Sequence, residues 1–209
     1  MKRAGLIFVI VLLVGAFSRV QAQRAIKNGF SINAVFGFPS ENFGVYGMPF
    51  KVKTLYGIKL GNRWYFNPNE KYGFGLMVNW FDISLGVSTD YIDNTKYAIA
   101  DIVISAIELG PIGTYAISGD MAIDGYYNLK PTVFSSAIAN ENEDSYAAAG
   151  IGFSHVLGAA FRYKVLNIGL EYSFGSVNVS NEEANGIHSF DNSGIMKINS
   201  FRIVLGAKF

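Results

Sequence analysis

Apolar and polar side chains alternate along this chain from residue 29 onward, in a series of separate stretches. In the first stretch Phe30, Ile32 and Phe36 share one face, while Ser31 and Asn33 share the other. Seven later stretches repeat the pattern, around residues 56–66, 72–80, 97–117, 123–133, 146–163, 168–175 and 201–209. Successive side chains of a strand point to opposite faces, so this period predicts eight β-strands, each with one apolar and one polar face.

The connections between the strands alternate in length. Short turns are expected near residues 67–71, 118–120 and 165–167, and Gly119-Asp120 suits a two-residue hairpin. Long polar loops are expected at residues 39–53, 84–96, 136–145 and 180–194. An even number of antiparallel strands places both ends of the chain on the same side of the barrel, next to the short turns. The predicted fold class is all-β: an eight-stranded antiparallel up-and-down transmembrane β-barrel.

The fourth stretch, residues 97–117, is the least regular of the eight. If the outward positions of Ile107 and Leu109 are extended back along the chain, Val103 falls on the outer face. The same parity puts Ile102 and Ile104 on the inner face, which is polar elsewhere. The two faces of this strand are therefore expected to differ less in polarity than those of the other strands.

The first 22 residues have the three parts of a secretory signal peptide. Lys2 and Arg3 precede an apolar run at residues 4–17, and residues 20–22 (Val-Gln-Ala) form a small-residue cleavage site. An uncleaved membrane anchor would need roughly 18 or more apolar residues, and this run is shorter. We expect cleavage after Ala22, which leaves residues 23–209 as one barrel domain.

Charge and cysteine content exclude several kinds of protein. Removing Lys2, Arg3 and Arg19 from the 17 basic residues leaves 14 against 16 acidic ones, so no basic excess points to nucleic acid. The chain contains no cysteine, which excludes disulfides, thiolate metal sites and lipid attachment through an N-terminal cysteine. A closed barrel in lipid supplies another source of stability, because all its backbone polar groups can pair across strands.

The placement of aromatic residues favours a membrane barrel over a soluble β-sandwich or a lipocalin-like barrel. In both soluble folds the apolar strand faces point inward, and aromatic residues need not gather at strand ends. In transmembrane barrels they form girdles at the membrane surfaces. The residues expected in such a girdle are Trp64, Phe66, Tyr72, Trp80, Tyr115 and Tyr163.

Charged residues of both signs fall on the predicted inner face of the barrel. An eight-stranded barrel is only just wide enough for its own side chains, and an unpaired buried charge is costly. We therefore expect these charges to pair and to close the lumen; the alternative is a narrow channel whose selectivity they set. The predicted lumen network consists of Lys59, Arg63, Glu108, Asp124, Lys130, Arg162, Glu171 and Arg202.

No catalytic site is predicted. Ser154 and His155 are adjacent and so point to opposite faces of their strand, which prevents contact between a nucleophile and its base. We interpret His155 as an interfacial residue near the outer rim of the apolar band, and His188 as a solvated loop residue. Loop carboxylates could hold Ca²⁺ but have no EF-hand spacing, so no metal or other cofactor is predicted. These carboxylates are Glu141, Glu143, Asp144, Glu182 and Glu183.

Three segments carry a resemblance to a known family: residues 201–209 (FRIVLGAKF), 169–174 (GLEYSF) and 124–131 (DGYYNLKP). With its alternation, the chain resembles the OmpA/OmpX-like outer membrane protein β-barrel domain group over essentially all of residues 23–209. The resemblance implies location in the outer membrane of a Gram-negative bacterium and contact with its lipid and lipopolysaccharide. It also implies insertion by the outer-membrane assembly machinery, with Phe209 as the assembly signal at the end of the series Phe201, Ile203 and Leu205.

The resemblance does not imply a single function, because one fold can carry many functions. We expect a non-enzymatic structural or surface-binding role through the extracellular loops, with a loop ligand that the sequence does not identify. The alternatives are a narrow porin-like channel or transporter of small or apolar solutes and, third, a lipid-modifying barrel enzyme.

Overall fold

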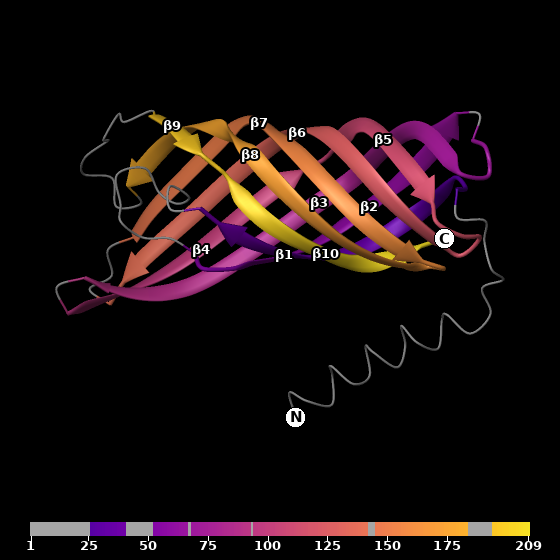
Figure 1. Ribbon diagram of the computed structural model, residues 1–209. Helices are drawn as coiled ribbons and strands as arrows, with labels where there is room; N and C mark the ends of the chain where they lie inside the picture. The colour runs from indigo at the N-terminus through magenta and orange to yellow at the C-terminus, as the bar shows by residue number, and fades with distance from the viewer. Residues whose placement is uncertain (1–25, 41–51, 67, 93, 142–144, 184–193) are drawn as a thin grey trace, which may run out of the picture.

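A computed structural model describes residues 26–40, 52–66, 68–92, 94–141, 145–183 and 194–209, and in them every strand pairs antiparallel with its neighbours (Figure 1). The expected signal peptide, residues 1–22, lies outside the described residues. No helix in the described part of the chain is long and apolar enough to cross a membrane. The strands are β1 (Gly29–Pro39), β2 (Leu55–Phe66), β3 (Tyr72–Ile92), β4 (Thr95–Ser105), β5 (Glu108–Ala116), β6 (Met121–Asn140), β7 (Ser145–Tyr163), β8 (Leu166–Glu183), β9 (Gly194–Lys197) and β10 (Ser200–Lys208).

These strands close into a ring. Strand β10 pairs with β1 on one side, for example Phe36 with Ile203, and with β8 on the other, for example Leu170 with Ile203. Strands β4 and β5 follow each other along β6, and β9 and β10 follow each other along β8, so each pair makes one crossing of the barrel wall. The result is the predicted eight-stranded up-and-down barrel, closed by the pairing of its last strand with its first.

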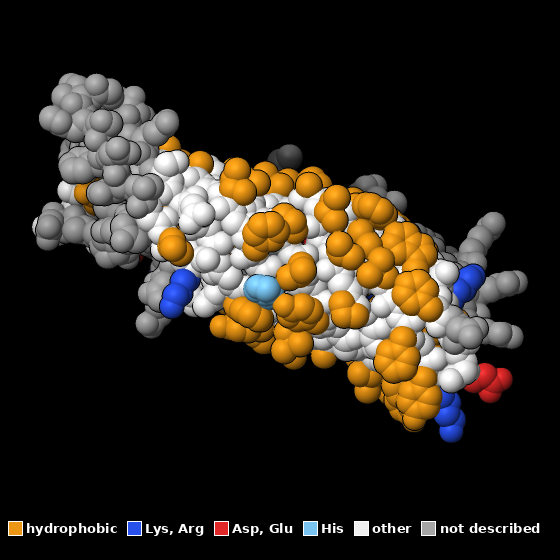
Figure 2. Space-filling view, turned by 90° about the horizontal axis from the view of Figure 1, so that it is seen from above, with side chains coloured by type: hydrophobic (Ala, Val, Ile, Leu, Met, Phe, Trp, Pro, Cys, Tyr) orange, Lys and Arg blue, Asp and Glu red, His pale blue; other side chains and the backbone are white. Residues whose placement is uncertain are grey.

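Inside and outside alternate along each strand as the sequence predicts. On β6, Ile123 and Leu129 are exposed on the outer surface, whereas Asp124, Asn128 and Lys130 are buried in the interior. Apolar side chains are spread over the outer wall, and on the face seen in Figure 2 the charged side chains lie toward its ends. This is the arrangement of a barrel whose outer wall faces lipid.

One irregularity moves a charged residue into the lumen. The register between β2 and β3 shifts at Leu60 and Gly61, and Trp80 and Phe81 are both exposed on the outside. Because a bulge inserts one extra residue, every later side chain of β3 changes face. Asp82 is consequently buried in the lumen, with no exposed surface.

A second irregularity corrects the predicted faces of residues 97–117. The strand is broken between β4 and β5, where Ala106 and Ile107 are both exposed. Beyond the break the parity reverses: Val103 is buried inside, whereas Ile102 is exposed and Ile104 is half-buried on the outside. The expectation for these three residues was wrong because it carried a single parity through the break.

The prediction of a long loop is also wrong for two of the four segments. Residues 84–96 and 136–145 are mainly strand, and the hairpins β3–β4 and β6–β7 continue almost to their tips. A strand needs about 9–11 residues to cross the hydrocarbon layer. Strands β3, β6, β7 and β8 have 21, 20, 19 and 18 residues, and so extend well beyond that length. We call the part of these strands that lies beyond the membrane crossing the extension. The end of the barrel that carries the extension is the hairpin end, and the opposite end is the short-turn end.

The polarity of the two faces is reversed in the extension. Its interior is an apolar cluster that includes Phe134, Ile138, Ile99 and Val177, all at most 2% exposed. Its outer face carries small residues such as Ala137 on β6, although Val87 and Tyr91 on β3 are also exposed there. Water surrounds the strands beyond a membrane, so apolar side chains are more stable inside than outside there. The extension is therefore packed like a water-soluble β structure on top of a lipid-facing barrel.

Candidate functional site

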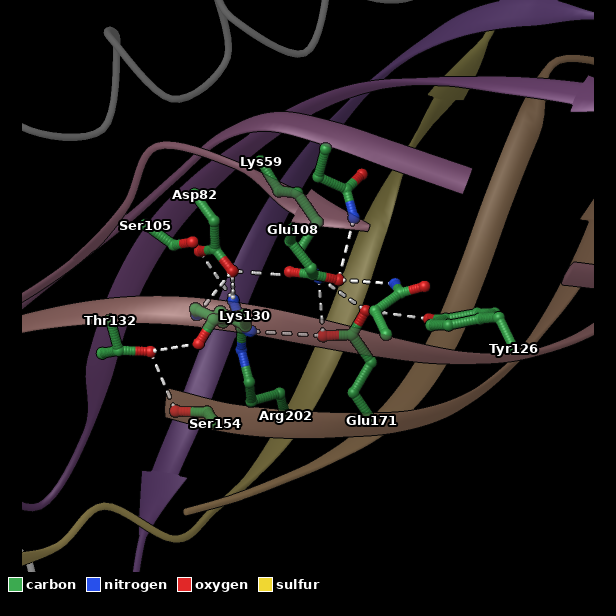
Figure 3. Close-up of polar contacts among 12 residues, drawn as sticks. Lys59, Asp82, Ser105, Glu108, Tyr126, Lys130, Thr132, Ser154, Glu171 and Arg202 are labelled. Atoms are coloured by element: carbon green, nitrogen blue, oxygen red, sulfur yellow. Dashed lines mark hydrogen bonds and ion pairs between the residues drawn. The ribbon is translucent and has the colours of Figure 1, made fainter. Parts of the chain in front are cut away.

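A central charge cluster lies in the lumen, and Figure 3 shows its side chains pointing toward one another from several strands. It contains six charged side chains, each at most 4% exposed, contributed by six strands: Lys59, Asp82, Glu108, Lys130, Glu171 and Arg202. Lys59 Nζ lies 2.7 Å from Glu171 Oε1 and 3.4 Å from Glu108 Oε2. Asp82 Oδ2 lies 2.7 Å from Lys130 Nζ and 2.8 Å from an Arg202 guanidinium nitrogen. The cluster thus joins strands from all around the barrel.

The central cluster is electrically balanced, with three cations and three carboxylates. Five of its members were predicted from strand parity, and the structure brings them together. The sixth, Asp82, was missed because the predicted third strand ended at Trp80, and the parity of that strand would have turned Asp82 toward lipid. One signal was available: the predicted lumen set had five cations and only three carboxylates, so another carboxylate was to be expected.

Neutral side chains donate further hydrogen bonds to the central cluster, although Glu108 Oε2 and Arg202 Nη1 have no hydrogen-bond partner among the described residues. The amides of Asn79 and Asn128 donate to Glu108 Oε1 at 2.9 and 2.7 Å. The hydroxyl of Tyr126 donates to Glu171 Oε1 at 2.8 Å. Gly158 makes room for this tyrosine, because a Cβ there would lie 2.3 Å from its ring. Buried carboxylates that accept several hydrogen bonds are held in one geometry.

A second group, the basal cluster, lies nearer the short-turn end. Asp124 accepts hydrogen bonds from Arg63 Nη1 at 2.6 Å, from Arg162 Nε and Nη2 at 2.7 and 2.9 Å, and from Thr114 Oγ1 at 2.6 Å. Tyr65 in turn contacts Thr114, with 2.8 Å between their oxygens. The three charged residues were all predicted to face the lumen, and they form one buried group.

The space around the two clusters is filled by apolar and hydroxyl side chains. Met77, Ile112 and Val156 belong to an apolar group in the same half of the barrel as the basal cluster. Above the central cluster, Thr132 and Ser154 are hydrogen-bonded at 2.9 Å, and the apolar core of the extension follows. A cavity of about 20 Å³ next to Lys130 and Arg202 has room for about one water molecule. The described side chains thus close the lumen at several levels.

The residues considered for catalysis are placed as expected on opposite faces. Ser154 is buried inside, whereas the ring of His155 stacks between Tyr127 and Phe174 on the outer surface. The Tyr127 hydroxyl and His155 Nδ1 are 2.5 Å apart. His155 lies four residues below Ile151, so it is within the upper part of the apolar band. The loop histidine His188 lies outside the described residues.

Most residues of the predicted aromatic girdle lie at the short-turn end, and their role at a membrane surface stays a prediction. The rings of Tyr72 and Tyr115 are 5.3 Å apart, and Phe66 and Tyr163 are also exposed there. Trp80 lies eight residues further along β3 than Tyr72, so it is above this rim. It packs edge-on against Trp64, with ring centroids 5.9 Å apart.

The terminal strand contributes its apolar face to the outer wall. Phe201, Leu205 and Phe209 are exposed on the outside, and Ile203 is half-buried between its neighbours. The backbone N–H of Phe209 donates to the carbonyl oxygen of Phe30 at 2.8 Å, which continues the seam between the last and first strands. The role of these four residues as an assembly signal remains a prediction.

One buried carboxylate belongs to the extension. Asp101 lies 14 residues beyond Tyr115 along β5 and β4, which is more than the crossing requires. Burial raises the pKa of Asp101 to about 6, although a hydrogen bond from the Ser136 hydroxyl opposes the shift. Its Oδ2 atom has no hydrogen-bond partner in the part of the chain that the structure describes. This carboxylate is therefore a local source of instability at neutral pH.

Most of the loop carboxylates considered for metal binding lie outside the described residues. Residues 142–144 lie outside the described part of the chain, and so do the side chains of Glu182 and Glu183. Among the described residues, no three His, Asp or Glu side chains are grouped in a way that could hold a metal ion.

Comparison with known proteins gives structural matches only. No protein-family model matches the sequence, and no curated protein is significantly similar to it. The attachment invasion locus protein Ail of Yersinia pestis has a TM-score of 0.50 and 14% identity, over 87% of this chain and 97% of Ail. The outer membrane protease OmpT of Escherichia coli (TM-score 0.47, 9% identity) covers 87% of this chain and 94% of OmpT.

A major outer membrane protein of Thermus thermophilus has a TM-score of 0.48 and 11% identity, over 88% of this chain and 99% of that protein. The match to Ail is evidence of a shared fold and not of a shared function. With its closed ring of eight antiparallel crossings, its apolar outer wall and its polar lumen, this chain has the fold of the small outer-membrane β-barrel proteins.

Proposed function

We propose that this protein is an integral outer-membrane barrel with a closed lumen and a non-enzymatic structural or surface-binding role at its hairpin end. The observation that carries the proposal is the extension. Its apolar interior, with Phe134 fully buried, holds two long hairpins rigidly beyond the length that crosses the membrane. A rigid, folded protrusion supports contact with a partner outside the cell, because it presents the hairpin tips with little loss of conformational entropy.

The filled lumen supports a structural barrel over a channel. An ion in transit would have to displace buried pairs such as Lys59 with Glu171 and Lys130 with Asp82, whose atoms are 2.7 Å apart in both cases. Breaking a buried ion pair costs several kcal/mol when one partner is left alone. The packed apolar groups on either side of the central cluster add further barriers.

The environment of Ser154 argues against hydrolytic chemistry at the residues that first suggested it. Ser154 is 1% exposed, its hydroxyl is hydrogen-bonded to that of Thr132, and His155 is on the other side of the wall. A serine nucleophile needs a base within hydrogen-bond reach. No such arrangement is formed by this pair.

The outer wall supports location in the outer membrane, with lipid and lipopolysaccharide as its surroundings. We further propose that Phe209 is recognised by the outer-membrane assembly machinery, since it closes the apolar series of the terminal strand. A barrel inserted by that route has its short turns in the periplasm and its long hairpins outside the cell.

Single-cysteine labelling tests this orientation cleanly, because the chain has no cysteine of its own. Ala139→Cys introduces a thiol near the tip of the β6–β7 hairpin, and Ser118→Cys a matched one at a short turn; both positions are exposed. In intact cells, a membrane-impermeant maleimide should label Ala139→Cys and not Ser118→Cys. The opposite labelling would refute the proposed outward role of the extension.

Conductance tests the closed lumen. Refolded protein in planar lipid bilayers should give no steady unitary currents, whereas a general porin in the same bilayers provides the positive control. Reproducible openings of the refolded protein would overturn the closed-lumen proposal in favour of a channel.

A further inference from the structure

His155 is a polar side chain on the lipid-facing wall of the barrel. On strand β7 it lies eight residues above Tyr163, which is exposed at the short-turn rim. At about 3.3 Å per residue and a strand tilt of about 40°, this separation corresponds to about 20 Å of height. The apolar band of such barrels is about 25 Å tall, so the imidazole lies about 5 Å inside the membrane boundary at the hairpin end. The ester and amide carbonyls of membrane lipids lie close to this boundary, between the hydrocarbon and the headgroups.

The imidazole of His155 is held in one orientation, with one nitrogen left over. Its ring stacks between those of Tyr127 and Phe174, with centroids 5.9 and 5.2 Å away. Among the described residues, the Tyr127 hydroxyl has only His155 Nδ1 as a hydrogen-bond partner, so the hydroxyl donates and Nδ1 accepts. The ring proton is then on Nε2, which has no hydrogen-bond partner in the described part of the chain. An N–H group without an acceptor is costly in lipid, so Nε2 is available to a lipid oxygen.

The outer wall becomes polar immediately above this level on strand β8. Phe174, which pairs directly with His155, is the last apolar side chain of the outer face there. The next two outward residues of the strand, Ser176 and Asn178, are polar and exposed. Ser176 pairs with Lys197 of β9, whose exposed side chain is on the same face because directly paired residues point to the same side of a sheet. Figure 2 shows this change as a crowded apolar surface on the short-turn side of the histidine and a mainly white surface on the hairpin side.

His155, Ser176 and Lys197 are neighbours across three adjacent strands. Directly paired residues such as Ser176 and Lys197 have Cβ atoms about 5 Å apart, and diagonal neighbours such as His155 and Ser176 about 7 Å. Lys197 has no ion pair with any residue that the structure describes. This part of the wall therefore offers an N–H donor at the level of lipid carbonyls and an ammonium group at the level of lipid headgroups. Charge complementarity favours an anionic headgroup, because an ammonium group forms its stronger hydrogen bonds with charged oxygens.

We propose that His155, Ser176 and Lys197 form a binding site for one lipopolysaccharide molecule of the outer leaflet. Lys197 holds a phosphate group of the lipid, and His155 Nε2 donates a hydrogen bond to the carbonyl oxygen of an acyl linkage below it. The acyl chains lie along the apolar wall beneath, next to the ring of Phe174. Lipopolysaccharide fits both contacts, because its lipid part carries phosphate groups and ester- and amide-linked acyl chains on the same sugars. The site rests on the proposed orientation of the barrel, which places the hairpin end in the outer leaflet.

Native mass spectrometry of the barrel, refolded in micelles and titrated with purified lipid A, tests the site; lipid A is the acylated and phosphorylated part of lipopolysaccharide. Wild-type protein should retain one molecule of lipid A and bind the dephosphorylated form about fivefold more weakly. Lys197→Met should weaken binding of phosphorylated lipid A by the same factor and leave binding of the dephosphorylated form unchanged. The matched control is Lys96→Met, which removes an exposed lysine from the outer face of β4 at the same end and should bind like wild type.

His155→Phe tests the second contact. The phenyl ring keeps the stack with Tyr127 and Phe174 but has no N–H, so this variant should bind both forms of lipid A about threefold more weakly.

Three results would overturn the proposed site. Equal affinity of the wild type for the two forms of lipid A would do so without any variant. Equally strong retention of phosphatidylglycerol would do so as well, because the wall would then bind any anionic lipid. The third result is wild-type affinity of Lys197→Met for phosphorylated lipid A. Because the protein is refolded for this measurement, the result does not depend on orientation in cells, and failure of the site is distinguishable from failure of the labelling experiment.

Discussion

Replacement of Asp82 by Asn is the sharpest test of the central cluster. Asp82 accepts hydrogen bonds from Arg202 Nη2 and Lys130 Nζ at 2.7–2.8 Å, and Lys59 Nζ is 3.9 Å away. The amide keeps the shape of the side chain but removes the charge, so three buried cations would face two carboxylates. Removing one partner of a buried ion pair typically costs about 3–5 kcal/mol.

Urea titration of the refolded barrel in lipid vesicles measures this loss. With an m-value of about 2 kcal/mol per molar urea, the unfolding midpoint should fall by roughly 1.5–2.5 M. Asp90→Asn is the matched control, because Asp90 lies on the same strand, is exposed and accepts a hydrogen bond from the next backbone N–H. Its midpoint should change by an amount close to the error of the measurement.

A double variant shows whether Asp82→Asn loses stability through charge imbalance or through packing. Lys130→Met in the Asp82→Asn background restores the charge balance, so it should recover part of the lost stability. The reasoning would be refuted if Asp82→Asn unfolded at the same urea concentration as Asp90→Asn. It would also be refuted if Lys130→Met destabilised the Asp82→Asn protein as much as it does the wild type.

Three further outcomes are expected. The raised pKa of Asp101 means that the folded state binds its proton more tightly than the unfolded chain, so stability falls as pH rises from about 4 to about 6. Asp101→Asn should therefore stabilise the protein at pH 7 by at most about 3 kcal/mol and give no gain below pH 4, as measured by unfolding midpoints at both pH values. Phe134→Ala should lower the free energy of unfolding of the extension by about 3–5 kcal/mol. Protease should then cleave the hairpins β3–β4 and β6–β7, while the membrane-embedded half stays resistant. Equal cleavage of both halves would contradict a separate core in the extension. Deletion of Phe209 should reduce the folded, heat-modifiable form in cell membranes more than after refolding in micelles, and normal accumulation in cells would count against its role as an assembly signal.

Which side chains face the lumen could be predicted from the amino-acid sequence for most of the membrane-embedded half. A period of two, with large apolar residues on one face and charged ones on the other, is sufficient to predict which residues of β1, β2, β6, β7 and β8 point inward. In this half the outside of the wall is always lipid and the inside is always a narrow lumen. Whether a side chain is apolar or charged therefore indicates which face of the strand it lies on. All eight predicted lumen charges are buried in the lumen. Six lie in β2, β6, β7 and β8, where the alternation is uninterrupted, Glu108 begins β5, and Arg202 lies in the terminal strand β10.

The faces of the remaining residues and the apolar interior of the extension could be seen only in the tertiary structure, because two of its features do not follow from alternation. A bulge or break shifts parity by one residue, and only the pairing of neighbouring strands shows where that happens; Asp82 enters the lumen and Ile102 leaves it for this reason. The polarity of the two faces also depends on what lies outside the wall, and this changes from lipid to water along a single strand such as β6. Lys130 and Ile138 both point inward from β6, but one is charged and the other apolar because they lie in different halves. The boundary between the halves depends on how much of the assembled barrel lies within the membrane.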